Sequence, residues 1–246
     1  YSIFTRSGTV SIWLALKALD VKDKKIIIPA NICYLVVFAI VLSGNRPVVV
    51  DASENGGIDL HQIRNLQDST IAGVIYPYMY GNTGNILDVK NIATKNNWFL
   101  IEDVAQAFGA KINNVYAGSF GDVSVLSFGN GKPIDMKTGG AINFKSAILY
   151  KRIKELYEKL PYFSSKEDVN LSVLSNEYNK IINNKDANLF SFNSIHNYYQ
   201  GLINKINVTD GYFKELDNKI KNIDLSVSIR KDYSDLFVTA LKNNTH

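Results

Sequence analysis

The sequence predicts an α/β fold of three layers, in which a mostly parallel sheet is covered by helices on both faces. Over the first 144 residues, short apolar runs rich in Val and Ile alternate with longer segments of helix length. The short runs are apolar throughout rather than at every second residue, which is typical of strands buried on both faces of a parallel sheet. From about residue 145 these runs stop, and Lys, Asn, Ser and Glu become common. A helical segment without strands is therefore expected to follow the sheet.

Six segments are expected to form the strands. The first, Lys25–Ile28, contains three isoleucines and is stopped by Pro29, which has no N–H to donate to a neighbouring strand. The remaining segments have the same short, apolar character. They are Pro47–Asp51, Ala72–Tyr76, Trp98–Glu102, Asp122–Phe128 and Gly140–Phe144.

Four segments, one before the first of these strands and three between them, have the length and pattern of helices. Thr9–Leu19 carries apolar residues on a broad helical face. Leu87–Asn96 is expected to begin at a cap formed by Asn85 or Asp88. The other two are the apolar segment Asn31–Ser43 and the weaker segment Asp59–Leu66.

The last hundred residues are expected to be mainly helical. Lys145–Leu160 is amphipathic, and Thr209–Ile223 and Ser226–Lys242 are two further helical segments. Between them Ser164–Asn193 is polar and rich in asparagine, as expected of a long excursion from the fold. We therefore place a large domain at residues 1–150 and a helical segment at residues 151–246.

Composition excludes several kinds of protein. The apolar fraction is 46%, the charged fraction 20% and the net charge +4, which is typical of a globular domain and gives no reason to expect nucleic-acid binding. One cysteine, Cys33, can form neither an internal disulfide nor a thiolate cluster, and three scattered histidines do not suggest a metal site. The longest apolar run, Cys33–Leu42, is far shorter than the ~20 residues that a membrane-spanning helix needs. We expect a cytoplasmic protein, and a chain that begins and ends inside a longer one.

Candidate site residues follow the predicted strands. In an open parallel sheet, ligands bind beyond the carboxyl ends of the strands. Asp103 and Ser127 stand at two such ends, and Ser127 is followed by a loop with two glycines and a lysine. Near the amino terminus, Ser7, Gly8 and Thr9 open the first predicted helix. They suit an anion, because the first N–H groups of a helix are free and Gly8 permits close approach. The plainer alternative is an ordinary helix cap.

Lys132 is the most reactive candidate. Gly129, Gly131 and Pro133 restrict its loop, and a lysine held beside a buried strand can be desolvated, which favours the neutral, nucleophilic amine. The alternative is an exposed loop lysine, the usual environment of this residue. Lys137 is a second candidate in the same loop.

Asp103 and Gln106 are three residues apart, so in a helical turn they face the same way. Asp103 could hold a protonated ring nitrogen, or it could simply cap a short helix. The loop Gly129–Lys132 lacks the Ser or Thr that follows the lysine of a P-loop, and it lacks the third glycine of a dinucleotide-binding motif. A Ser-His-Asp or Cys-His arrangement is not suggested either, because neither His61 nor His196 follows a predicted strand.

Taken in order, these segments resemble the DegT/DnrJ/StrS family of pyridoxal-phosphate-dependent sugar aminotransferases. The resemblance covers residues 5–144 and is carried by RSGTVSIWLALKAL, by IEDVAQAFGA, by GSFGD and by the lysine and double glycine that follow SF. It implies the large domain of a fold-type I pyridoxal-phosphate enzyme. It also implies that an amino-terminal helix and a small C-terminal domain lie outside this chain.

The resemblance also implies roles for individual residues. Lys132 falls on the lysine that forms a Schiff base with pyridoxal 5′-phosphate, and Asp103 on the aspartate that pairs with the pyridine nitrogen. Gln106 falls on the glutamine near the ring hydroxyl. Gly8, Thr9 and Ser127 fall on phosphate-binding positions.

Three positions depart from the family pattern or are weakly placed. The aromatic residue that often stacks on the cofactor falls near Cys33, with Tyr34 as the nearest aromatic side chain. Tyr78 stands where the family has a histidine before its Tyr-Gly pair. Asn197 is a weak candidate for the residue that reaches a partner subunit's active site.

The implied function is transfer of an amino group from an amino acid, glutamate being the usual donor, to a nucleotide-linked keto-sugar. A sugar dehydratase of the same family has a histidine at the position of Lys132, which argues against that activity here. The alternative from another class is a cofactor-binding relative without catalysis. The family also implies a homodimer, and we expect Tyr34–Val41 with Tyr76, Tyr78 and Tyr80 to supply its interface, the alternative being that Tyr34–Val41 is core.

Overall fold

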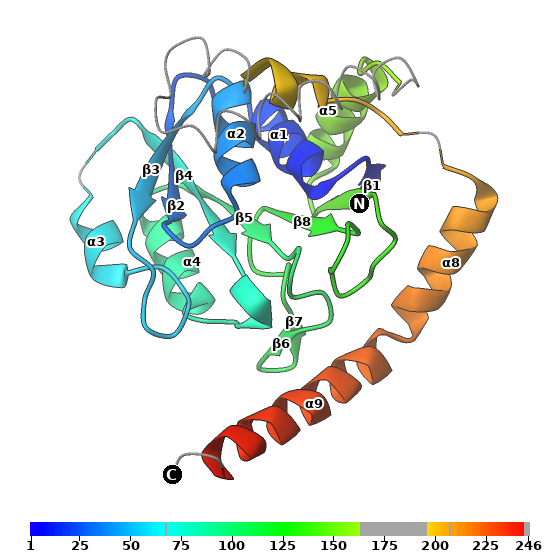
Figure 1. The fold of residues 1–246 in the computed structure, drawn as a ribbon. Helices are drawn as coiled ribbons and strands as arrows, with labels where there is room; N and C mark the ends of the chain where they lie inside the picture. The colour runs from blue at the N-terminus through cyan, green and yellow to red at the C-terminus, as the bar shows by residue number, and fades with distance from the viewer. Residues whose placement is uncertain (67, 163–195, 207, 244–246) are drawn as a thin grey trace, which may run out of the picture.

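A seven-stranded sheet forms the centre of the molecule (Figure 1). The computed structural model of the chain describes residues 1–66, 68–162, 196–206 and 208–243. From one edge to the other, the strand order is β1-β9-β8-β5-β4-β2-β3. In that order the strands are Ser2–Thr5, Gly140–Phe144, Val123–Ser127, Phe99–Asp103, Ile71–Pro77, Lys25–Pro29 and Arg46–Val50.

The sheet is mostly parallel, as predicted. The pairs β5–β8, β4–β5, β2–β4 and β2–β3 are parallel. Only β9 runs against its neighbours, β8 on one side and β1 on the other. As a consequence β1, β4, β5 and β8 all end at the same edge of the sheet, which places their following residues together.

Helices cover both faces and make the fold three-layered. The helices α1 (Gly8–Ala18), α2 (Tyr34–Leu42) and α5 (Ala147–Glu158) contribute buried side chains to one core cluster. Helices α3 (Leu60–Asn65) and α4 (Ile86–Lys95) contribute to a second cluster. The sheet supplies the rest of both clusters. The predicted α/β/α architecture is therefore confirmed.

The predicted strands and helices are present, with ends that differ by a few residues. The sequence did not indicate β1 or the small hairpin of β6 (Lys111–Ile112) and β7 (Val115–Tyr116). Asn85 occupies the cap position of α4, but its side chain does not bond to that helix. It instead accepts from the N–H of Ile58 at 3.2 Å and donates to the carbonyl oxygen of Ile58 at 2.7 Å.

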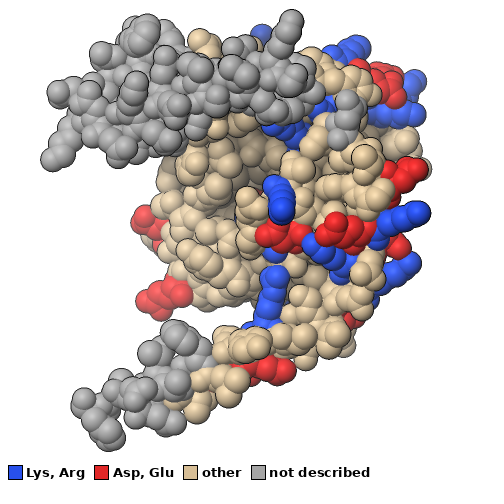
Figure 2. Space-filling model, turned by 45° about the vertical axis from the view of Figure 1, so that its right-hand side comes forward, with Lys and Arg blue, Asp and Glu red and all other residues tan. Residues whose placement is uncertain are grey.

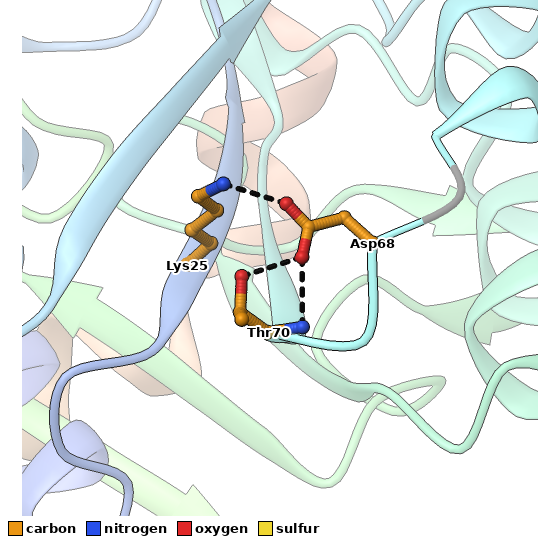
Figure 3. Close-up of polar contacts among 3 residues, drawn as sticks. All are labelled: Lys25, Asp68 and Thr70. Atoms are coloured by element: carbon orange, nitrogen blue, oxygen red, sulfur yellow. Dashed lines mark hydrogen bonds and ion pairs between the residues drawn. The ribbon is translucent and has the colours of Figure 1, made fainter.

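One ion pair links the start of β2 to the turn before β4, at the end of these strands away from their carboxyl ends (Figure 3). The Nζ of Lys25, the first residue of β2, lies 2.6 Å from a carboxylate oxygen of Asp68. The other carboxylate oxygen of Asp68 accepts from the N–H of Thr70 at 2.8 Å, just before β4 begins. The hydrogen bond with Lys25 is the main cause that lowers the pKa of Asp68. The carboxylate is therefore ionised at neutral pH, and the pair connects the start of β2 to the turn before β4.

Two helices lie at the C-terminal end of the described chain. Helix α8 (Asp210–Lys221) contributes Leu216 to the second core cluster, and α9 (Ile223–Asn243) continues beyond the sheet (Figure 1). The expected excursion at Ser164–Asn193 lies outside the described residues. The division into a domain at 1–150 and a segment at 151–246 stays a prediction, and Ile153 of α5 belongs to the first core cluster. Within the described residues, none of the helices has the length and apolarity needed to cross a bilayer.

Candidate active site

A cavity of about 290 Å³ opens at the edge where β1, β4, β5 and β8 end. Its walls come from the start of α1, the start of α2, and the residues that follow β4, β5 and β8. The six residues to which the resemblance assigns a catalytic or cofactor-binding role all line this one cavity. They are Gly8, Thr9, Asp103, Gln106, Ser127 and Lys132.

The start of α1 forms the wall of this cavity that could hold an anion. The Ser7 hydroxyl accepts from the N–H of Val10 at 3.3 Å, so the plainer interpretation of a helix cap is correct for Ser7. The N–H of Thr9, by contrast, has no bonding partner among the residues that the structure describes, whereas the backbone at Ser7 pairs with Gly139 in a parallel bridge. Free N–H groups at a helix start carry a partial positive charge, which suits a phosphate or carboxylate.

Gly140 allows this helix start to lie against the sheet. A Cβ atom at Gly140 would lie 2.6 Å from the carbonyl carbon of Ser7 and 2.8 Å from the nitrogen of Gly8. Both atoms belong to the backbone and cannot rotate away. Gly8 itself lies close to Ser127, because a Cβ there would be 3.1 Å from the Cβ of Ser127. Close backbone packing therefore places the helix start beside the end of β8.

We expect Gly140→Ala to displace the start of α1 and lower the free energy of unfolding by about 1–3 kcal/mol, the usual cost of overpacking. Thermal unfolding measures this loss. Gly129→Ala is the matched control, because the nearest atom to a Cβ at Gly129 is the Ser127 hydroxyl oxygen at 3.6 Å, an ordinary contact. Equal melting temperatures for the two variants would show that the close approach at Gly140 does not matter.

Asp103 is the last residue of β5, and its side chain is buried in the cavity wall. One carboxylate oxygen accepts from the N–H of Ala105 at 3.0 Å. Burial raises the pKa of Asp103, while the Ala105 N–H and the charge of Lys132 act in the opposite direction. The carboxylate is therefore a buried acid that a further positive charge in the cavity would stabilise.

Lys132, rather than Lys137, reaches this cavity. Lys132 is half-buried and lines it, whereas Lys137 is exposed and does not. The loop between them is held internally by Asp135, whose carboxylate accepts from the N–H groups of Gly131 at 2.7 Å and Lys137 at 2.9 Å. These two hydrogen bonds lower the pKa of Asp135, so it is ionised at neutral pH.

Gln106 lies in a turn after β5 rather than in a helix, but it faces the cavity as expected. Its side-chain oxygen accepts from the N–H of Tyr80 at 2.9 Å, which links the turn to the segment after β4. Tyr78 also lines the cavity, and its N–H donates to the carbonyl oxygen of Asp103 at 3.1 Å. The two segments that follow β4 and β5 are thus bonded to each other beside Asp103.

The hydroxyl of Tyr78 is hydrogen-bonded to a buried side chain. It donates to the buried carboxylate of Glu102, which also accepts from the N–H groups of Gly118 at 2.7 Å and Phe120 at 2.7 Å. Burial is the main cause that raises the pKa of Tyr78, and the Glu102 carboxylate adds to it. Tyr78 therefore stays protonated and serves as a wall residue rather than as a proton carrier.

The remaining walls are mainly apolar. Cys33 lines the cavity, whereas Tyr34 is 54% exposed and does not. Three apolar residues that the sequence did not single out also line it, namely Ile12 of α1 and Leu35 and Val36 of α2. Asn197 is exposed and is not among the lining residues. In the described part of the chain, His, Cys, Asp and Glu do not gather into a group of three that could hold a metal ion.

Charges of both signs share one side of the molecule (Figure 2). In this view, Lys and Arg side chains alternate with Asp and Glu side chains rather than forming a continuous basic surface. This face therefore does not suggest a binding site for a polyanion such as nucleic acid.

The model of the DegT/DnrJ/EryC1/StrS aminotransferase family matches residues 1–171. The chain belongs to this family. The membership confirms the resemblance noted in the sequence. It also agrees with the fold, in which the motifs IEDVAQAFGA and SFGNGK supply residues of the cavity.

Named members of the DegT/DnrJ/EryC1/StrS family resemble the chain over part of their length. The chain is 31% identical to GDP-perosamine synthase of Escherichia coli O157:H7 over 154 residues, which are 62% of this chain and 42% of that enzyme. It is 32% identical to dTDP-3-amino-3,6-dideoxy-alpha-D-galactopyranose transaminase of Aneurinibacillus thermoaerophilus over 159 residues, 63% of this chain and 44% of that enzyme.

A solved structure supports the same relationship. NtdA from Bacillus subtilis, which was crystallised with the bound cofactor PMP, superimposes with a TM-score of 0.60 at 26% identity. The superposition covers 66% of this chain and 37% of NtdA. The chain therefore spans about two fifths of the length of these family members.

Proposed function

We propose that the chain is the cofactor-binding part of an aminotransferase that uses pyridoxal 5′-phosphate (PLP). The amino group moves from an amino acid, glutamate, to a nucleotide-linked keto-sugar. The observation that carries this proposal is a single cavity that holds a buried carboxylate, a lysine and a helix start with a free N–H group. The names of the related enzymes, which make or transaminate nucleotide-linked amino sugars, supply the substrate class.

The residues of the cavity fit PLP. Its phosphate matches the start of α1 at Gly8 and Thr9, where the N–H of Thr9 is free, with the hydroxyls of Thr9 and Ser127 as further donors. Its protonated ring nitrogen matches Asp103, whose buried carboxylate otherwise accepts from Ala105 and is stabilised by the charge of Lys132. Its aldehyde matches the amine of Lys132. Gln106 lines the cavity with Asp103, and its side chain would be available to bind a substituent of the ring.

When bound, PLP supplies an electron sink for the negative charge that develops on the amino acid's Cα. The chain's own residues have three tasks. Asp103 stays ionised beside the ring nitrogen and keeps it protonated. Lys132 would hold the cofactor and, with its amine free, would accept a proton from Cα as general base and return one as general acid. Gly8, Thr9 and Ser127 would hold the phosphate and so limit movement of the cofactor relative to Lys132.

The first half-reaction, in which the amino acid gives its amino group to the cofactor, tests the proposed activity. PLP is added to the protein, the visible absorption of the lysine-bound cofactor is recorded, and L-glutamate is then added. We expect the visible band to disappear and about one equivalent of 2-oxoglutarate to form per cofactor. A panel of nucleotide-linked keto-sugars should then restore the band and yield an amino sugar by mass spectrometry. A bound cofactor that reacts with none of the common amino acids would favour the second candidate, a cofactor-binding relative without catalysis.

Thr9→Ala should weaken cofactor binding without removing the chemistry. A hydrogen bond to a charged group is worth about 1.5–3 kcal/mol, so we expect the Kd for PLP to rise about 10- to 100-fold. Excess PLP should restore most of the turnover. The titration uses the visible band of the lysine-bound cofactor. A Kd equal to that of the parent would show that the Thr9 hydroxyl does not contact the phosphate.

We also propose a cytoplasmic homodimer with a shared active site. On α2 the side chains of Tyr34 and Val41 are exposed, while Val36, Ala39 and Ile40 are buried. The helix therefore supplies both core and surface. Tyr80, which follows β4, is 89% exposed. Tyr76 and Tyr78 are fully buried, so the prediction that they form an exposed interface was wrong. The exposed residues Tyr34, Val41 and Tyr80 support a partner surface, and Asn197 stays the predicted contribution to the partner's site.

A further inference from the structure

The loop that carries Lys132 contains two glycines, which allow many backbone conformations, yet it must hold the Lys132 amine in one position. Gly129 and Gly131 flank the lysine on its amino-terminal side, and Gly131 has a φ of +72°, which only glycine adopts at no steric cost. A lysine side chain adds several freely rotating bonds of its own. A displacement of about 1 Å can lower a reaction rate about 100-fold. The position of Lys132 therefore depends on what fixes its backbone.

Three donors from the C-terminal helices bind the carbonyl oxygens that follow Lys132. Arg230 of α9 donates from Nη2 to the carbonyl oxygen of Pro133 at 3.0 Å. Lys219 of α8 donates from Nζ to the carbonyl oxygen of Asp135 at 2.6 Å. The hydroxyl of Tyr212 donates to the carbonyl oxygen of Thr138 at 2.6 Å. The three acceptors lie along six residues of one loop, and the first of them is the residue next to Lys132.

Two of these bonds are made by charged donors, which form stronger hydrogen bonds than neutral groups do. Lys219 is also held in place from its own helix, because its Nζ lies 2.8 Å from a carboxylate oxygen of Glu215. Ile134 and Met136 fix the loop on its other side, since both are buried in the second core cluster. The backbone after Lys132 is therefore held between the core and the two helices.

We propose that Lys219 and Arg230 are positioning residues, which hold the loop so that the amine of Lys132 points into the cavity. This inference rests on the proposed function, because it assigns to Lys132 the task of capturing PLP. It adds that α8 and α9, whose described side chains contribute none to the cavity wall, control how fast that capture takes place.

The test compares two double variants that remove the same charge from the same helices. Lys219→Met with Arg230→Met removes both charged donors. Lys221→Met with Lys231→Met is the matched control, because Lys221 pairs with Asp217 on its own helix and Lys231 is exposed. Two quantities are measured on each protein. The first is the rate at which added PLP, at saturating concentration, produces the visible band. The second is amide hydrogen exchange in a peptide covering residues 129–138 without cofactor.

We expect the first double variant to capture PLP about tenfold more slowly and its loop to exchange about tenfold faster. The control should stay within twofold of the parent in both measurements. Lys219→Arg with Arg230→Lys keeps a donor at each position and should recover most of the capture rate. A general loss of stability would instead raise exchange throughout the protein and would leave capture at saturating PLP unchanged.

One result would overturn the inference: a capture rate in the first double variant that matches the control. This holds even if its loop exchanges faster, because the helices would then hold the loop without positioning Lys132. If the parent protein captures no PLP, the proposed function has failed, and loop exchange alone tests the role of Lys219 and Arg230. Loop exchange in the first double variant equal to that in the control overturns this role. Faster loop exchange in the first double variant supports it.

Discussion

Lys132→Ala should abolish covalent attachment of PLP and remove nearly all amino transfer. The substitution deletes the amine that lines the cavity, and with it the group that moves the proton at Cα. Acid–base catalysis alone is typically worth about 10²–10⁴-fold, and the loss of the covalent link adds to that loss. Turnover and the visible band are both measured.

Lys137→Ala is the matched control for this variant. Lys137 lies in the same loop but is exposed and does not line the cavity. Its N–H, which bonds to Asp135, is kept by alanine. We expect the control to retain the visible band. Loss of the band in Lys137→Ala but not in Lys132→Ala would assign the covalent role to Lys137.

Asp103→Asn should have two opposite effects. Turnover should fall about 10²–10³-fold, because a neutral amide cannot keep the ring nitrogen protonated, and such losses are typical when one preorganised charge partner is removed. The cofactor-free protein, in contrast, should become more stable at pH 7. The amide oxygen can still accept from the N–H of Ala105, and the buried charge is gone.

The sign of the stability effect follows from the pKa of Asp103. Burial raises this pKa in the folded protein above the ordinary value of about 3.9 that applies to the unfolded chain. Folding is therefore opposed by the charge above the folded pKa, and this opposition disappears as the pH falls. We expect a rise in melting temperature of a few degrees at pH 7, about what 1 kcal/mol produces in a protein of this size, and a smaller rise at lower pH. A lower melting temperature at pH 7 would show that the carboxylate stabilises the cofactor-free fold.

Much of the fold could be predicted because most of its strands are short apolar runs, and β2, β4, β5 and β8 are largely buried. Such runs identified β2, β3, β4, β5, β8 and β9. The edge strand β1 escaped notice because it has four residues and pairs only with β9, far along the chain. The hairpin of β6 and β7 has two residues in each strand, too few for a period to show.

The polar residues of the site could also be predicted, since Asp103, Ser127 and Lys132 follow buried strands where ligands bind. The apolar wall could not. Ile12, Leu35 and Val36 have the helical spacing of ordinary core residues, and only the fold shows that they face a cavity. The role of Lys219 and Arg230 could not be predicted from the sequence either. Each resembles an exposed helix residue, and each binds a backbone carbonyl that lies 84 or 97 residues earlier in the chain.

The central claim is that Lys132 holds the cofactor, and reduction of the loaded protein tests it most directly. Borohydride converts the link between a lysine and PLP into a stable adduct, which peptide mass spectrometry then locates. We expect one phosphopyridoxyl group per chain, on the peptide that contains Lys132 and at that residue. An adduct at Lys137 or at another lysine, or the absence of any specific adduct at saturating PLP, would contradict the account.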